Sequence, residues 1–143
     1  MIVISHRGNT AGPLPEWENN PNYVDIAWQE FNVEIDVRFL NGEFWLGHDK
    51  PQYKVNYDFV QREGMWCHAK DVNALDRLLS MNVNCFWHQI DDRTLTSKGV
   101  IWTYPGRETT KKSVIVQVDC DSFDKLVNTN IVGVCTDYAK FLK

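Results

Sequence analysis

The stretch VEIDVRFLNGEFWLGHD, residues 33–49, decides the fold of this 143-residue chain. Its first part alternates apolar residues with the carboxylates Glu34 and Asp36, and this period of two is typical of a β-strand. Asn41 and Gly42 follow, and Asn-Gly between two strand-like runs is the strongest short-range signal for a β-hairpin. The stretch therefore predicts a strand, a tight turn and an antiparallel return strand that ends at Gly-His-Asp.

Segments with helical periodicity lie among the short apolar runs on both sides of this hairpin. Apolar side chains recur three and four positions apart in three segments, residues 19–31, 70–82 and 121–130. Asn20 and Asp71 are the predicted N-caps of the first two helices, and Val127 is predicted to face inward on the third. Strand–helix alternation favours an α/β protein with parallel strands.

The length of the chain limits the kind of α/β fold. A (β/α) barrel typically takes about 250 residues, so a barrel of 143 residues must have lost helices and shortened its loops. We predict a shortened, irregular (β/α) TIM-type barrel with a β-hairpin after the second strand, as one domain over residues 1–143. PGRETTKK, residues 105–112, is one place where we expect a loop instead of a helix.

Composition excludes several functional classes. A net charge of −4 disfavours nucleic-acid binding by bulk electrostatics. No apolar run approaches the roughly 20 residues that span a bilayer, and no secretory leader is visible at the N-terminus. The four cysteines have no CxxC spacing, and three lie in apolar runs, so we expect reduced core thiols in a cytoplasmic protein.

Two carboxylates on the predicted strand give the first indication of chemistry. Glu34 and Asp36 are two positions apart, so their side chains point to the same face. Carboxylates that share a face repel each other unless a cation lies between them. A hard divalent ion, Mg²⁺ or Ca²⁺, suits such an oxygen pair. The alternative is a solvated strand face without a metal.

Two histidines stand at predicted strand ends, where ligands usually bind in α/β proteins. His6 and Arg7 follow the apolar run at the N-terminus, and His48 ends the return strand of the hairpin. One imidazole can take a proton from an attacking hydroxyl while the other gives one to a leaving alkoxide. Arg7 can hold two phosphoryl oxygens with its planar fork. These residues are the groups that cleavage of a phosphate diester requires.

Four segments in order resemble the glycerophosphodiester phosphodiesterase family and, more broadly, the phospholipase-C-like phosphodiesterases. They are ISHRGN, EWENN, VEIDVRFLNGEFWLGHD and VGVCTDY. The resemblance is dense over roughly the first 50 residues and sparse afterwards. It implies that His6 and His48 exchange protons with the ester oxygens and that Arg7 grips phosphate. It also implies that Glu34 and Asp36 bind a divalent cation.

CHAK, residues 67–70, stands where the family has Glu-x-Lys on its third strand. Lys70 matches the family's lysine, which implies a second phosphate contact. His68 replaces the expected metal-binding glutamate. It is either a third metal ligand, which would favour Mn²⁺ or Zn²⁺ over Ca²⁺, or a hydrogen-bonding neighbour of a site completed by water.

The segment from residue 86 to residue 106 contains further candidates. His88 ends a strand-like run and could contact the leaving group, or Asp91 could supply the missing metal carboxylate. Trp87 and Trp102 are either core residues or an apolar wall of the pocket. Asp137 lies in the predicted last strand, where we expect it to close the barrel without a catalytic role.

The sequence therefore predicts a metal-dependent phosphodiesterase acting on a small-molecule phosphate diester. Its candidate site comprises catalytic His6 and His48, substrate-binding Arg7, Lys70 and His88, and metal-binding Glu34, Asp36 and His68. The alternative on the same fold is a catalytically inactive module that binds a phosphate ligand. A purely structural, partner-binding protein is a third hypothesis. The substrate and the oligomeric state stay open.

Overall fold

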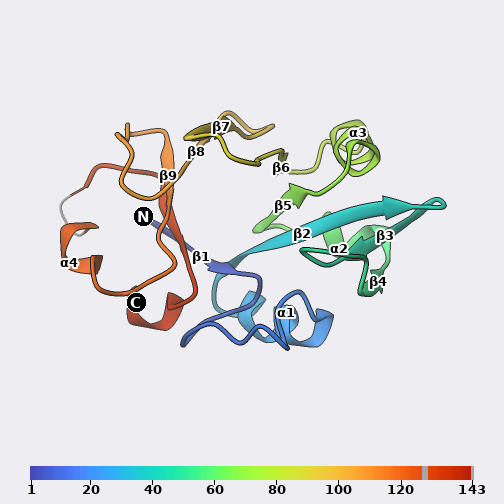
Figure 1. The fold of residues 1–143 in the computed structure, drawn as a ribbon, viewed down its shortest axis with the longest axis horizontal. Helices are drawn as coiled ribbons and strands as arrows, with labels where there is room; N and C mark the ends of the chain where they lie inside the picture. Colours follow the sequence, from blue (N-terminus) through green and yellow to red (C-terminus); the bar gives the residue numbers. More distant parts are fainter. Residues whose placement is uncertain (127–128, 143) are drawn as a thin grey trace.

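The computed structural model describes residues 1–126 and 129–142, which form one strongly curled sheet with helices on its outer side (Figure 1). The strands are β1 (Ile2–His6), β2 (Asn32–Leu40), β3 (Glu43–Leu46), β4 (Tyr53–Val55), β5 (Met65–Ala69), β6 (Cys85–Phe86), β7 (Arg93–Leu95), β8 (Ile101–Thr103), β9 (Ser113–Val116) and β10 (Gly133–Thr136). The helices are α1 (Pro21–Trp28), α2 (Tyr57–Val60), α3 (Val72–Ser80), α4 (Phe123–Leu126) and the 3₁₀ helix η1 (Ala139–Leu142).

Seven strands form a parallel curl in the order β6-β5-β2-β1-β10-β9-β8. β3 and β4 extend β2 as antiparallel strands, and β7 pairs antiparallel with β8. Among the described residues no ladder joins β6 to β8, although Ser97 N donates to Cys85 O over 2.8 Å. The fold is thus a truncated, TIM-like half-barrel with a hairpin after its second strand, as predicted.

The predicted hairpin turn is confirmed at residues 41 and 42. Asn41 has φ of 51° and Gly42 has φ of 77°, and two consecutive left-handed residues are what the tightest hairpin turn requires. Leu40 pairs with Glu43 across the turn. The turn therefore fixes the register of β2 and β3, which places Gly47 beside Asp36, where its N–H donates to Asp36 O over 3.1 Å.

The helices begin where their caps predict. The side chain of Asn20 accepts from the backbone of Asn22 and Tyr23 at the start of α1, and that of Asp71 accepts from Ala74 in α3. α4 is a single turn, and the predicted inward-facing Val127 lies outside the described residues. Residues 105–112 form a loop, as expected, so β9 follows β8 without a helix.

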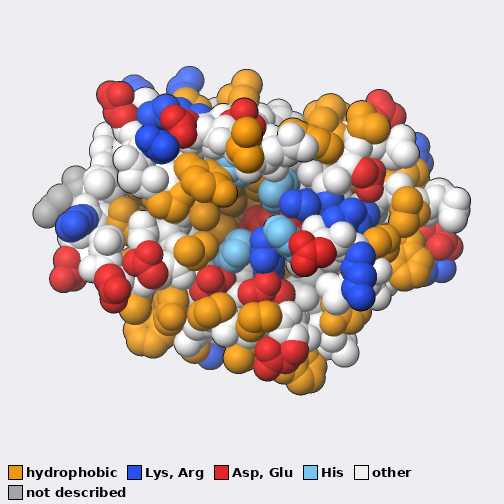
Figure 2. Space-filling view, viewed as in Figure 1, with side chains coloured by type: hydrophobic (Ala, Val, Ile, Leu, Met, Phe, Trp, Pro, Cys, Tyr) orange, Lys and Arg blue, Asp and Glu red, His pale blue; other side chains and the backbone are white. Residues whose placement is uncertain are grey.

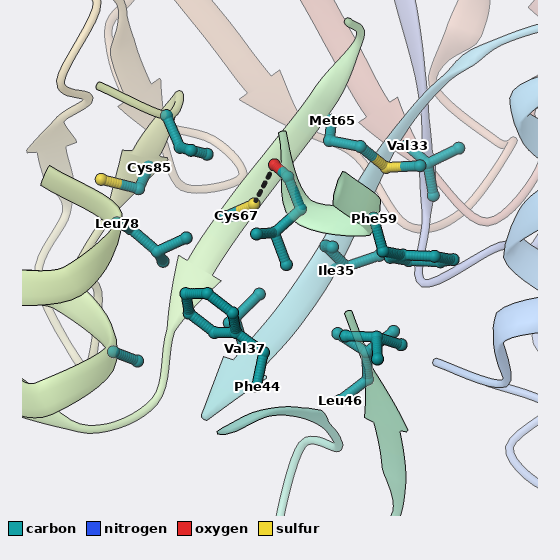
Figure 3. Packing of buried hydrophobic residues seen from close by; sticks show 14 of the residues in the cluster. Val33, Ile35, Val37, Phe44, Leu46, Phe59, Met65, Cys67, Leu78 and Cys85 are labelled. Atoms are coloured by element: carbon teal, nitrogen blue, oxygen red, sulfur yellow. Dashed lines mark hydrogen bonds between the residues drawn. The ribbon is translucent and has the colours of Figure 1, made fainter. Parts of the chain in front are cut away.

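The outer face of the sheet holds the largest hydrophobic cluster. Val33, Ile35 and Val37 of β2 are fully buried beneath the helices, and Leu78 of α3 packs into the same cluster (Figure 3). Because strand side chains alternate, the intervening Glu34 and Asp36 point into the half-barrel, where they are 2% and 0% exposed. The alternative of a solvated strand face is therefore wrong.

A second cluster fills the inside of the curl below the carboxyl ends of the strands. It comprises Ile4, Trp66, Phe86, Trp102, Val114 and Cys135. The rings of Phe86 and Trp102 stack with centroids 4.4 Å apart. This buried apolar layer lies beneath the polar side chains that stand nearer the carboxyl ends of the strands.

The structure also bears on two features expected from the composition, the state of the cysteines and the membrane-spanning segments. All four cysteines are free thiols, and Cys67, Cys85 and Cys135 are buried, which confirms them as core residues. Within residues 1–126 and 129–142, no helix has the length and apolar character needed to cross a membrane.

Candidate active site

A pocket of about 350 Å³ opens at the carboxyl ends of the parallel strands. Seven of the eight predicted site residues line it, and they are His6, Arg7, Glu34, His48, His68, Lys70 and His88. The eighth, Asp36, lies fully buried beside Glu34 on the same face of β2. Figure 2 shows histidine, lysine and arginine side chains gathered around this central hollow. The structure therefore brings the predicted set together.

The turn after β1 directs two adjacent side chains to the site. Arg7 has φ of 56° and Gly8 has φ of 94°, so the backbone turns sharply where the strand ends. A Cβ atom on Gly8 would lie 2.7 Å from the ring of Tyr23, which explains why glycine stands here. The backbone N–H of Arg7 donates to Glu34 O over 2.9 Å and ties this turn to β2.

Glu34, Asp36 and His68 form a cluster whose potential ligand atoms all lie within 4.8 Å of one another. His68 Nδ1 is 3.6 Å from Glu34 Oε1 and 3.4 Å from Asp36 Oδ1. Glu34 Oε2 and Asp36 Oδ1 are buried and have no hydrogen-bond partner among the residues that the structure describes. Buried carboxylate oxygens without partners are costly unless a cation neutralises them.

A hydrogen bond between His68 and the backbone of His88 determines which ring nitrogen of His68 carries the hydrogen. His68 Nε2 is 2.9 Å from His88 O, and since a carbonyl can only accept, Nε2 carries the hydrogen. Nδ1 of the neutral ring then turns a lone pair toward two carboxylates, an arrangement that needs a cation. Burial lowers the pKa of His68, but the carboxylates of Asp36 and Glu34 outweigh this and raise it to about 9. The donor set fits either a proton on Nδ1 or a divalent metal.

Asp36 is held by neighbours on three sides. Its Oδ2 lies 2.9 Å from Arg7 Nε and accepts from Asn19 Nδ2 over 2.9 Å, while its backbone N–H donates to Asn19 Oδ1. Burial alone would raise the pKa of Asp36, but the adjacent imidazole of His68 and the charge of Arg7 hold it below its usual range. Asp36 is therefore an ionised, rigidly oriented carboxylate.

The two predicted acid–base histidines have matching hydrogen bonds but different surroundings. His6 Nδ1 lies 2.8 Å from Asp137 Oδ1, and its Nε2 is 3.9 Å from Glu34 Oε2. Burial lowers the pKa of His6, while the hydrogen bond with Asp137 and the charge of Glu34 produce a net rise. His48 Nδ1 lies 2.7 Å from Asp49 Oδ1 at the exposed rim. Nε2 of each imidazole makes no hydrogen bond with the described residues.

Asp137 is a site residue whose part the sequence analysis missed. β10 runs parallel to β1 with Ser5 opposite Thr136, so the next residues, His6 and Asp137, lie side by side. Asp137 also accepts from Asn9 Nδ2 over 2.8 Å and is 6% exposed. The sequence did contain a signal for this contact. Asp137 follows the predicted last strand, which pairs with the first strand in a closed barrel, so it could be expected to lie beside His6.

Lys70 and His88, which follow β5 and β6, complete the set of predicted residues in the pocket. Lys70 Nζ is 3.9 Å from Asp36 Oδ1. His88 is 8% exposed, and neither ring nitrogen has a hydrogen-bond partner among the described residues. Burial lowers the pKa of His88, and the nearby charge of His68 lowers it further, so its imidazole is neutral and faces the pocket with unused hydrogen-bonding capacity.

The other three candidates from residues 86–106, Asp91, Trp87 and Trp102, lie in different surroundings. Asp91 is 60% exposed at its side chain and stands outside the cluster of Glu34, Asp36 and His68. Trp102 lines the pocket, whereas Trp87 packs against the cluster between the sheet and the helices. Trp102 therefore belongs both to the buried cluster inside the curl and to the pocket wall, whereas Trp87 is a partly buried neighbour of the outer cluster.

The same fold occurs in a solved structure, the crystal structure of a glycerophosphodiester phosphodiesterase from Agrobacterium tumefaciens str. C58. The two chains align with a TM-score of 0.61 at 10% sequence identity, over 99% of this chain and 97% of that chain. This chain has the fold of a glycerophosphodiester phosphodiesterase. The resemblance found in the sequence is thereby confirmed for the fold. No family model matches the sequence, and no curated protein matches it.

Proposed function

We propose that the protein is a metal-dependent phosphodiesterase that hydrolyses a small phosphate diester. The observation that supports this most directly is the cluster of Glu34, Asp36 and His68 beside His6 and Arg7 in one pocket. Divalent-cation ligands, an acid–base group and a phosphate-binding cation are the parts that such a reaction needs. The glycerophosphodiester phosphodiesterase fold supports the same class by analogy.

Arg7 and Lys70 bind the phosphate in this proposal. Nε and Nη1 of Arg7 are held by Asp36 and Glu18, at 2.9 and 3.0 Å, while Nη2 makes no hydrogen bond with the described residues. Nη2 is therefore available to a phosphoryl oxygen, with the guanidinium already oriented. Lys70 adds a second positive charge from the end of β5, and the neutral His88 donates to an ester or phosphoryl oxygen.

His6 and His48 transfer the protons. Nδ1 of each ring faces a carboxylate, Asp137 or Asp49, which leaves Nε2 to meet the attacking or the leaving oxygen. His6 is the better oriented of the two, because its partner is buried and bonded to Asn9. Despite burial, the hydrogen bond with Asp137 and the charge of Glu34 raise the pKa of His6, which favours the protonated form and suits the acid role.

Glu34, Asp36 and His68 would hold the divalent metal. Their two partnerless carboxylate oxygens and the lone pair of His68 Nδ1 provide an oxygen–oxygen–nitrogen donor set. A bound cation supplies charge stabilisation at the phosphoryl group worth several kcal/mol. Imidazole in the set favours Mn²⁺ or Zn²⁺ over Ca²⁺, while the two carboxylates accept Mg²⁺ as well.

The test is hydrolysis of bis(p-nitrophenyl) phosphate by metal-stripped protein supplied with Mg²⁺, Ca²⁺, Mn²⁺ or Zn²⁺ in turn. We expect turnover that EDTA abolishes. Asp36→Asn should lower it about 10³-fold, since several kcal/mol of stabilisation are lost at 1.36 kcal/mol per tenfold. His6→Ala should lower it by about 10²- to 10⁴-fold. Leu95→Ala, at an exposed position away from the pocket, is the control.

Absence of turnover with every ion, from protein whose circular dichroism is that of a folded chain, would overturn the proposal. Titration with Mn²⁺ and inorganic phosphate would then separate the remaining hypotheses. Binding that Asp36→Asn weakens would indicate the catalytically inactive phosphate-binding module. Absence of any binding would favour a structural protein.

A further inference from the structure

The pocket has two unlike sides. Its charged side comes from the ends of β1, β2 and β5, and its other side comes from the ends of β8 and β9. The latter is built from five apolar or aromatic side chains, those of Trp102, Tyr104, Pro105, Val116 and Val118. Figure 2 shows this division, with hydrophobic side chains on one side of the central hollow and histidines and cations on the other.

The apolar side is open to solvent rather than packed away. Tyr104, directly after β8, is 44% exposed, and Val118, two residues after β9, is 38% exposed, whereas Trp102 on the same side is buried. Of the described residues that line the pocket, each one with a charged carboxylate, ammonium or guanidinium group lies on the charged side. The neutral ring of His88 stands at the boundary, 4.7 Å from the ring of Tyr104. Exposed apolar surface in a pocket is stabilised when an apolar group covers it.

The surface beyond Arg7 is different. A second cavity of about 440 Å³ shares Arg7 and His48 with the first, and its other lining residues are mostly polar: Pro15, Glu18, Asn19, Asp49, Lys50 and Gln52. A phosphate held at Arg7 and His48 would therefore have a polar groove on one side and an apolar wall on the other. The two ester oxygens leave the tetrahedral phosphorus in different directions, so one alcohol of a diester can occupy the polar groove while the other lies against the apolar wall.

We propose that the substrate is an amphiphilic phosphate diester, with a polar alcohol in the groove and an apolar alcohol against Tyr104, Val116 and Val118. This inference rests on the proposed function and names its substrate class. In the hydrolysis, the P–O bond to the apolar alcohol breaks and a P–O bond to the oxygen of water forms. One histidine takes the proton of water and the other gives a proton to the departing alkoxide. The products are an apolar alcohol and the phosphomonoester of the polar alcohol.

Two synthetic diesters of equal length test the proposal. One joins glycerol phosphate to 1-heptanol, and the other joins it to diethylene glycol monomethyl ether, which has ether oxygens in place of two methylenes. The ether alcohol is the better leaving group, so chemistry alone favours the second diester. We expect kcat/KM for the heptyl diester to be about tenfold higher, because each buried methylene contributes several-fold. The released alcohol identifies the bond that breaks.

Val118→Asp places a carboxylate on the exposed rim of the apolar side and should remove the preference for the heptyl diester. Leu95→Asp adds the same charge at an exposed position of β7 outside the pocket and should retain the preference. Equal turnover of both diesters, or release of glycerol with heptyl phosphate, would overturn this inference and leave the proposed function intact.

If neither diester is turned over, calorimetric binding of the two diesters in the presence of Mn²⁺ decides. Tighter binding of the heptyl diester, lost in Val118→Asp, would support the apolar subsite even though the proposed function had failed. Equal binding, or no binding, would overturn the subsite as well.

Discussion

The two halves of the half-barrel differ in the length of their strands and helices and in the site residues that they supply. Residues 1–82 contain the long hairpin and two capped helices of 8 and 9 residues, and they supply seven of the eight predicted site residues. Among the described residues between 83 and 142, each strand has two to four residues and each helix has four. In Figure 1, α1, α2 and α3 lie around β2 and β5, whereas α4 and η1 lie at the opposite end.

This difference indicates where the fold can be shortened. Buried charges such as Asp36 need a rigid frame, and the first half provides it through the cluster beneath α1, α2 and α3. An apolar wall requires less exact positioning, so short strands and loops suffice for Trp102 and Val116. The second half still provides one oriented polar group, Asp137, which reaches His6 across the pairing of β1 with β10.

Among the predictions that compare the two halves, the largest effect is expected at Asp137, the oriented polar group that the second half provides. Asp137→Asn should lower kcat about 10²-fold, because a neutral amide holds His6 Nδ1–H more weakly than the carboxylate and no longer stabilises the protonated imidazole. Asp49→Asn should change kcat less than about threefold, since its partner His48 is at the rim and the Asp49 side chain is 90% exposed. Steady-state kinetics on bis(p-nitrophenyl) phosphate measure both.

Asp137→Glu provides the matched rescue, since a carboxylate returns to the site with one more methylene. We expect it to recover part of the lost kcat, which a purely structural role for Asp137 would not produce. Equal losses in Asp137→Asn and Asp49→Asn would show that both histidines depend on their carboxylates alike. The contrast between a buried and an exposed partner would then be wrong.

The parts of the fold that the sequence predicts are those with local signals. Asn41-Gly42, the caps Asn20 and Asp71, and the alternation around Glu34 each act within a few residues, and the structure confirms them. The apolar stripe predicted for residues 70–82, which comprises Val72, Leu75, Leu78 and Leu79, is less successful. Val72 and Leu79 are 69% and 52% exposed, while Leu78 and the unpredicted Ala74 are buried.

The groups that sequence analysis missed act over long separations. Asp137 contacts His6 across 131 positions, a pairing that depends on which strands close the curl. Asn19 reaches Asp36 through a left-handed backbone with φ of 63°, which no periodicity indicates. Of the residues on the apolar side of the pocket, the sequence analysis named Trp102 and no other. Tyr104 and Val118 follow strands too short to show a clear alternation of apolar and polar residues.

Backbone strain offers a second way to compare the halves. Gly8→Ala should destabilise the protein by about 3 kcal/mol, since a left-handed φ of 94° costs about 1–2 kcal/mol for alanine and its Cβ would press on Tyr23. Gly99→Ala, at φ of 79° with nothing within 4 Å, should cost about 1 kcal/mol. Urea denaturation gives both free energies, and equal values would show that the turn after β1 can relax.

The smallest effect concerns the residue at which this chain departs from the family pattern. His68→Glu replaces the imidazole with a carboxylate and leaves an all-oxygen donor set around Glu34 and Asp36. Oxygen donors favour Ca²⁺ and Mg²⁺, so the ratio of Mn²⁺ to Ca²⁺ affinity should fall about tenfold, measured by calorimetry on the folded variant. The variant also loses the hydrogen bond from Nε2 to His88 O, and His68→Gln controls for this because it removes the imidazole without adding charge. An unchanged ratio in His68→Glu would mean that His68 pairs with the carboxylates as a cation, and the rigid first half would then hold a charge network in place of a metal.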